Sequence, residues 1–168
     1  MNNSKITPHF SNEEGANPKY FQFEADFVGS LQCIPMQVRM KLDNCGVKLK
    51  LVDWNHFSHS ERETLVNMPC VSASETEAYR QYLQNLLIVK TGQPAKELAI
   101  DPQPAWLDAQ SIPNSVQTKA QECQADISLK QWSNLLPEQR FALIKLSRPS
   151  HENQNFVPAL QEFEIVPK

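Results

Sequence analysis

The sequence predicts a mostly α-helical fold, a compact bundle of helix hairpins. Apolar residues recur at helical spacing through most of the chain after residue 53. The 168 residues include twelve prolines and only four glycines, and half of the prolines lie where a helix is expected to begin or end. No two glycines lie closer than 14 residues apart. This spacing excludes glycine-rich phosphate loops and dinucleotide-binding fingerprints.

The chain is expected to consist of a tail and one domain. Residues 1–19 are rich in Asn, Ser, Glu and Pro and lack periodicity, which predicts a disordered N-terminal tail. Residues 20–168 are expected to form a single helical domain. Within it, residues 93–112 hold three prolines and a tryptophan, so they predict a linker with at most one helical turn.

Three short segments are candidates for a small β element. Residues 21–27 (FQFEADF) and 47–51 (VKLKL) alternate apolar and polar side chains, the period of a half-buried strand. Residues 163–166 (FEIV) are the third candidate. If the first two paired, Lys48 and Lys50 would complement Glu24 and Asp26. Short helical or extended segments are the alternative interpretation.

Caps and breakers predict the helix ends. The first long helix begins near Ile34, with Pro35 in its first position, and Gly46 ends it. Two Ser-x-x-Glu patterns, at Ser60 and Ser74, predict capping boxes for the next two helices, which end before Pro69 and at Gly92. The remaining helices are expected over residues 113–124, 129–135, 137–146 and 155–163.

Two stretches match at an offset of 78 residues, which suggests a twofold internal repeat of a helix–break–helix unit. In each unit the Trp is expected to pack on the second helix, and the Arg to bind carbonyls freed at the break. Reuse of the same local chemistry without duplication is the alternative. The matched positions are Trp54 with Trp132, Phe57 with Leu135, Arg62 with Arg140, Leu65 with Leu143, Val66 with Ile144 and Met68 with Leu146.

Charge and hydropathy bear on partners and location. The net charge of −3 and the pI of about 5.8 provide no electrostatic reason to expect nucleic acid or an anionic membrane. The apolar residues of 137–146 belong in a core, whereas a DNA-recognition helix needs polar residues. No apolar run approaches the ~18 residues that span a bilayer. The N-terminus lacks the apolar region of a secretory signal, so a cytoplasmic protein is expected.

Neither a metal site nor catalysis is predicted. The cysteines are spaced 12, 25 and 53 residues apart without a CxxC pair, so four free thiols are expected in a reducing compartment. His56 and His59 could share a helix face, but no third ligand follows them. No Ser or Cys nucleophile is tied to His151 and Glu152 by any motif.

Two blocks, FQFEADFVGSLQCIPMQVRMKLDNCGVKLKLVDW (21–54) and QRFALIKLSRPSHENQNFVPALQEF (139–163), resemble the cyanobacterial nitrate reductase-associated proteins. The resemblance implies a role in nitrate assimilation, in which the protein is needed for active nitrate reductase. It brings no established active-site residues. Our leading hypothesis is a non-catalytic maturation or assembly factor, a chaperone that binds the reductase polypeptide and assists loading of its molybdenum cofactor or iron–sulfur cluster. A stable accessory subunit and an enzyme of molybdopterin metabolism are the alternatives.

Two groups of residues are candidates for binding such a partner. The loop 147–155 is polar and lies between two apolar helices, and it is either a recognition surface or an ordinary capped loop. A positive patch would receive an acidic partner surface or the phosphates of a transiently bound molybdopterin-type cofactor; no stably bound cofactor is expected. The oligomeric state stays open. The candidates are Arg39, Lys41, Lys48, Lys50, Arg140, Lys145, Arg148, His151, Glu152 and Asn153.

Overall fold

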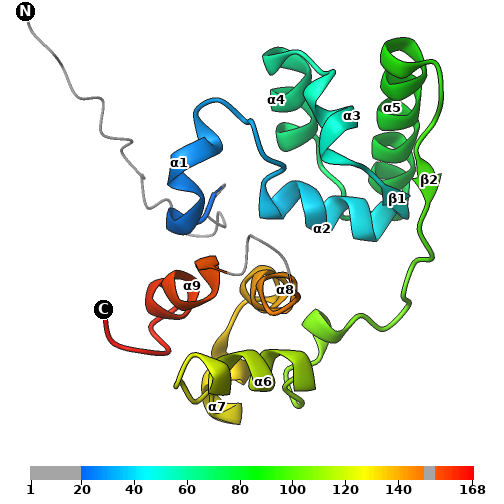
Figure 1. The fold of residues 1–168 in the computed structure, drawn as a ribbon. Coiled ribbons are helices and arrows are strands. Elements are labelled where there is room, and N and C mark those ends of the chain that lie inside the picture. Colours follow the sequence, from blue (N-terminus) through cyan, green and yellow to red (C-terminus); the bar gives the residue numbers. More distant parts are fainter. Residues whose placement is uncertain (1–19, 150–153) are drawn as a thin grey trace, which may run out of the picture.

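The computed structural model, described here for residues 20–149 and 154–168, confirms the mostly helical class with a small antiparallel sheet (Figure 1). The predicted tail and three predicted site residues, His151, Glu152 and Asn153, lie outside the described residues. The elements are η1 (Gln22–Glu24), α1 (Ala25–Val28), α2 (Met36–Cys45), β1 (Val47–Lys48), α3 (Leu51–Asn55), α4 (His59–Asn67), α5 (Ala73–Thr91), β2 (Lys96–Glu97), η2 (Ala105–Leu107), α6 (Asn114–Glu122), α7 (Leu129–Asn134), α8 (Pro137–Leu146) and α9 (Phe156–Glu162).

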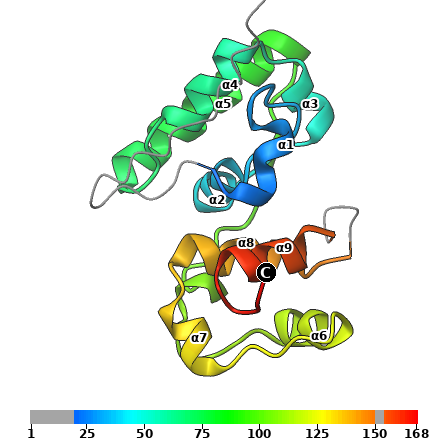
Figure 2. The same ribbon diagram turned by 90° about the vertical axis from the view of Figure 1, so that its left-hand side faces the viewer.

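The helices form two groups, with α3, α4 and α5 packed above α2, and α6 to α9 below it (Figures 1 and 2). Each group surrounds its own apolar cluster; the upper cluster includes Trp54 and the lower cluster includes Trp132. Helix α2 joins them because it presents Val38 and Leu42 to the first cluster and Met36 to the second. Segment 98–104 leads from the upper group to the lower one (Figure 1).

The strand predicted over residues 21–27 is wrong, because this segment forms η1 and α1. Phe21 and Phe23 do not point to opposite faces; their rings stack 5.1 Å apart, and the ring of Phe21 meets that of Phe163 at 5.3 Å. The carboxylate of Glu24 is buried and accepts hydrogen bonds from the N–H groups of Phe21 (3.1 Å) and Met36 (2.7 Å). The alternation therefore marks a turn in which the rings of Phe21 and Phe23 pack against the lower cluster, while the carboxylate of Glu24 holds the first residue of α2.

The structure contains a two-stranded sheet, but its strands are not the ones that the sequence predicted to pair. Residues 47–51 contribute only Val47 and Lys48, which pair with Glu97 and Lys96 of the predicted linker. Residues 163–166 are not a strand. Their backbone turns back onto α9, where the N–H of Ile165 donates to the carbonyl of Leu160 (2.9 Å), so no partner strand is needed.

Most predicted helix ends are confirmed within one or two residues. Gly46 and Gly92 adopt positive φ angles of 71° and 79° and end α2 and α5. The capping boxes of α4 and α5 lie two residues earlier than predicted, at Ser58 and Ser72. The pattern Ser-x-x-Glu occurs twice in each segment, and in both the first serine is the one in extended backbone that caps the helix.

Each Trp–Arg unit makes the contacts expected at its break. Arg62 donates from Nε to the carbonyl oxygen of Trp54 (3.2 Å), and Arg140 does the same to Trp132 (3.3 Å). Arg140 also donates to the carbonyl of Leu135, the C-terminal cap of α7 (2.8 Å). The prediction that the Arg binds freed carbonyls is confirmed; duplication as their origin stays a prediction.

Candidate functional site: a lysine-lined cleft

Four residues of the predicted positive patch use their charged groups to hold the fold together. Arg140 is 6% exposed, and its guanidinium donates to three backbone carbonyls. Lys145 on α8 forms an ion pair with Asp43 on α2 (2.8 Å). Lys41 donates to the carbonyls of Val66 and Met68 at the C-terminal end of α4, and Arg39 donates to the carbonyl of Ile34 (3.0 Å). We therefore leave these four out of the candidate site.

The predicted recognition loop is described only at its ends. Ser147 donates to the carbonyl of Ile144 (2.7 Å), and Arg148 is exposed just after α8. Arg148 does not line the cleft that contains Lys48 and Lys50. The residues of the predicted positive patch therefore do not form one continuous site in the structure. The role of the loop in partner binding stays a prediction.

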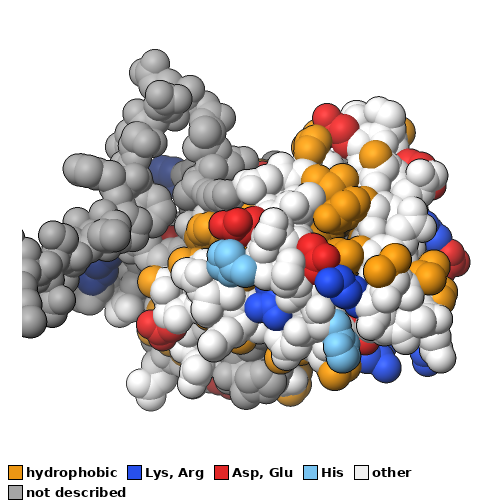
Figure 3. All heavy atoms as spheres, turned by 90° about the horizontal axis from the view of Figure 1, so that it is seen from above, with side chains coloured by type: hydrophobic (Ala, Val, Ile, Leu, Met, Phe, Trp, Pro, Cys, Tyr) orange, Lys and Arg blue, Asp and Glu red, His pale blue; other side chains and the backbone are white. Residues whose placement is uncertain are grey.

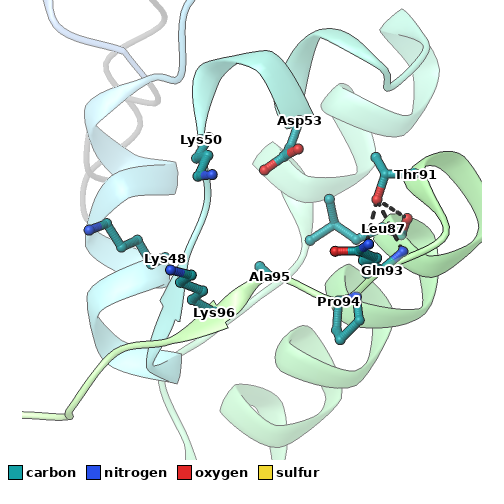
Figure 4. Close-up of a pocket in the computed structure, with 9 residues that line it drawn as sticks. All are labelled: Lys48, Lys50, Asp53, Leu87, Thr91, Gln93, Pro94, Ala95 and Lys96. Atoms are coloured by element: carbon teal, nitrogen blue, oxygen red, sulfur yellow. Dashed lines mark hydrogen bonds between the residues drawn. The ribbon is translucent and has the colours of Figure 1, made fainter.

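Lys48 and Lys50 line a cleft of about 340 Å³ together with Lys96, which the sequence analysis missed. We call it the lysine cleft. Figure 4 shows Lys48 and Lys96 extending from the two strands, with Lys50 just before α3 and Asp53 in its first turn. The opposite wall is the C-terminal end of α5 and the turn that follows, from Leu87 to Ala95 (Figure 4).

Local hydrogen bonds fix the wall formed by residues 91–95. The Thr91 hydroxyl lies 2.8 Å from the carbonyl oxygen of Leu87 and 3.0 Å from that of Gln93 (Figure 4). The side-chain amide of Gln84 on α5 accepts from the N–H of Ala95 (2.8 Å) and donates to its carbonyl (3.2 Å). The segment that leads into β2 is therefore tied to α5.

The cleft is positively charged. Within the part of the chain that the structure describes, neither an ion pair nor a hydrogen bond engages the ammonium of Lys48, Lys50 or Lys96. Glu97, beside Lys96, pairs with Arg80 instead. Asp53 is the single carboxylate among the lining residues. An arrangement of three lysines and one aspartate is suited to binding an anion.

The face above α3, α4 and α5 is mixed in character. Figure 3 shows hydrophobic side chains near its middle, with acidic, basic and histidine side chains around them. His56 and His59 are exposed, and His59 lies 3.5 Å from Glu63. Among the described residues, no group of three or more potential ligands could hold a metal ion. In the same residues, no helix has the length and apolar character needed to cross a bilayer.

The four cysteines are free thiols, as predicted. Burial raises the pKa of Cys45 to about 12 and also raises the pKa of Cys70. Because a thiolate is the nucleophilic form, both thiols are poor nucleophiles at neutral pH. They pack as small apolar side chains in the upper cluster.

Comparison with known proteins agrees with the resemblance noted in the sequence. The model of the family described as conserved nitrate reductase-associated protein matches residues 20–163. No curated protein and no solved structure matches the chain. The match covers the upper apolar cluster, the buried residues of the lower cluster except Ile165, the strands and the lysine cleft. The chain therefore belongs to the family of conserved nitrate reductase-associated proteins.

Proposed function

We propose that this protein is a non-catalytic maturation or assembly factor of nitrate reductase. It binds the reductase polypeptide and assists loading of the molybdenum cofactor or the iron–sulfur cluster. The name of the family supports an association with nitrate reductase. The single observation that carries the binding role is the lysine cleft, a hollow whose three ammonium groups have no ion-pair or hydrogen-bond partner among the described residues.

The composition of the cleft supports binding. Lys48, Lys50 and Lys96 are exposed, and hydrogen bonds tie Ala95, the residue before Lys96, to Gln84 on α5. Free positive charge on a fixed surface steers an acidic group toward it and holds that group by charge-assisted hydrogen bonds. During loading, that group belongs to the reductase or to the molecule inserted into it.

The test is the metal content of the reductase. Nitrate reductase is purified from cells that contain or lack this protein, and its molybdenum and iron are measured. We expect lower molybdenum, iron or both when the protein is missing. Fully loaded but inactive reductase would overturn the loading role.

Variants connect this function to the cleft. Cells that carry Lys48→Gln and Lys96→Gln together are expected to yield under-loaded reductase, whereas Lys130→Gln, an exposed lysine on α7, serves as the matched control. A complex that persists at equal stoichiometry with loaded enzyme would instead establish a stable accessory subunit. Normal loading with the double variant would remove the cleft from the function.

A further inference from the structure

We propose that the lysine cleft binds a small phosphate-bearing molecule. This inference rests on the proposed function, because it names the ligand class of the same cleft. Three observations carry it: the pairing of Lys48 with Lys96, the excess of positive charge, and the size of the hollow with its apolar wall.

The sheet places two like charges opposite each other. Lys48 and Lys96 are directly paired across the antiparallel ladder, so their side chains leave the same face. Directly opposite residues have Cβ atoms about 4.5–5.5 Å apart, and like charges in such a pair are destabilising. Each strand has two residues and offers little ladder energy against this repulsion. An anion bound between the ammonium groups turns the repulsion into attraction.

Neighbouring groups leave most of this charge uncompensated. Glu97 is engaged by Arg80, which also donates to the carbonyl of Cys45 (3.1 Å). Asp53 offers one negative charge. The dipole of α5 adds the equivalent of about half a negative charge at its C-terminal end. Against three ammonium groups, these contributions leave an excess of more than one positive charge, which suits a doubly charged phosphate.

The hollow has the size of a small-molecule site. Its volume of about 340 Å³ lies at the lower end of the roughly 300–1,000 Å³ typical of ligand pockets. The exposed Pro94 and the half-buried Ala95 provide a small apolar surface for the remainder of the ligand, next to the polar side chain of Gln93 (Figure 4). Lysines on separate segments can each approach a different phosphate oxygen as point charges.

The test uses the full chain and inorganic pyrophosphate as the probe. Isothermal titration calorimetry at constant ionic strength, with sodium chloride as the reference salt, measures its Kd. Lys48→Gln and Lys96→Gln are each expected to weaken binding about tenfold, the loss of one charge-assisted hydrogen bond. Lys130→Gln is expected to leave the Kd unchanged. All three positions are exposed, so each variant is expected to fold normally. Thermal unfolding checks this.

Three outcomes would overturn the inference. They are no binding of pyrophosphate, equal weakening by Lys130→Gln, and displacement of pyrophosphate by a hexaglutamate peptide that binds more tightly. The last would make the cleft a receptor for acidic polypeptide. The proposed function fails separately. If pyrophosphate binds at the lysines but reductase from cells that lack the protein is fully loaded with metal, the ligand is retained and the function is rejected. If pyrophosphate does not bind but reductase from those cells is under-loaded, the function is retained and the ligand is rejected.

Discussion

Arg140 donates from Nε to the carbonyl oxygen of Trp132, eight residues earlier in the chain, across 3.3 Å at the break between α7 and α8. Its other two nitrogen atoms reach the carbonyls of Trp106 and Leu135, both at 2.8 Å. The indole of Trp106 also packs edge-on against Phe141 (5.0 Å). One buried side chain thus ties η2, α7 and α8 together.

Replacing Arg140 by alanine is expected to lower the free energy of unfolding by about 2–4 kcal/mol, because it leaves buried carbonyls without donors. Urea unfolding at 25 °C measures the change. Arg148→Ala is the control; its side chain is exposed, so a change within about 0.5 kcal/mol is expected. Equal effects of the two substitutions would show that the carbonyls do not depend on Arg140.

The ion pair between Lys145 and Asp43 is expected to couple α8 to α2. Their side chains are 16% and 19% exposed, so water screens the pair less than a surface pair. A double-mutant cycle with Lys145→Met and Asp43→Asn is expected to give a coupling of about 1 kcal/mol. The pair Lys119–Glu122 within α6, whose carboxylate is 60% exposed, is the comparison and should give roughly 0.3–0.5 kcal/mol. A coupling energy for Lys145 and Asp43 below that for Lys119 and Glu122 would contradict the expected effect of burial.

The helical class was predictable because helix ends depend on local chemistry. Gly46 and Gly92 stop helices by adopting positive φ, and Ser128 caps α7 through its own side chain, just before residue 129, where the helix is predicted to begin. The segment 21–27 was not predictable in this way. Its structure depends on contacts with residues far along the chain, since Glu162 accepts the N–H groups of Gln22 and Phe23 (2.8 and 3.2 Å).

The candidate site was predictable only in part. Lys48 and Lys50 stood out because they alternate with apolar residues. Lys96 lies in a two-residue strand within a proline-rich segment, where no period can be detected. Arg140 and Lys145 were included in the predicted patch because the sequence shows their charge but not their partners. The guanidinium of Arg140 is bound to carbonyls, and the ammonium of Lys145 is paired with Asp43.

Glu24 is expected to make stability fall as pH rises. Burial raises the pKa of its carboxyl above the usual 4.5, although hydrogen bonds from Met36 and Phe21 oppose the shift. From pH about 4.5 upward, the folded state therefore binds more protons than the unfolded state until the raised pKa is passed. The free energy of unfolding decreases across that window.

The variant Glu24→Gln is expected to remove this decrease, measured by urea unfolding from pH 4.5 to 8. Glu61 and Glu75 do not contribute to the change in stability over this pH range. Hydrogen bonds from the N–H groups of Ser58 and of Ser72, respectively, lower the pKa of each, so their contributions are complete above the unfolded value and are lost only in more acidic solution. An unchanged slope in the variant would assign the pH dependence to other groups.

Gly46 is expected to tolerate no side chain, and its replacement should loosen the lysine cleft. A Cβ atom there would lie 2.7 Å from the carbonyl oxygen of Leu98 and 2.9 Å from the side chain of Ile100, at a φ of +71°. Gly46→Ala should therefore cost about 1–3 kcal/mol in thermal or urea unfolding. It should also speed amide exchange at Leu98, whose N–H donates to the carbonyl of Gly46 (2.8 Å). Gly29→Ala is the control, because Gly29 has a φ of −70° and open space around it, and a change under about 1 kcal/mol is expected.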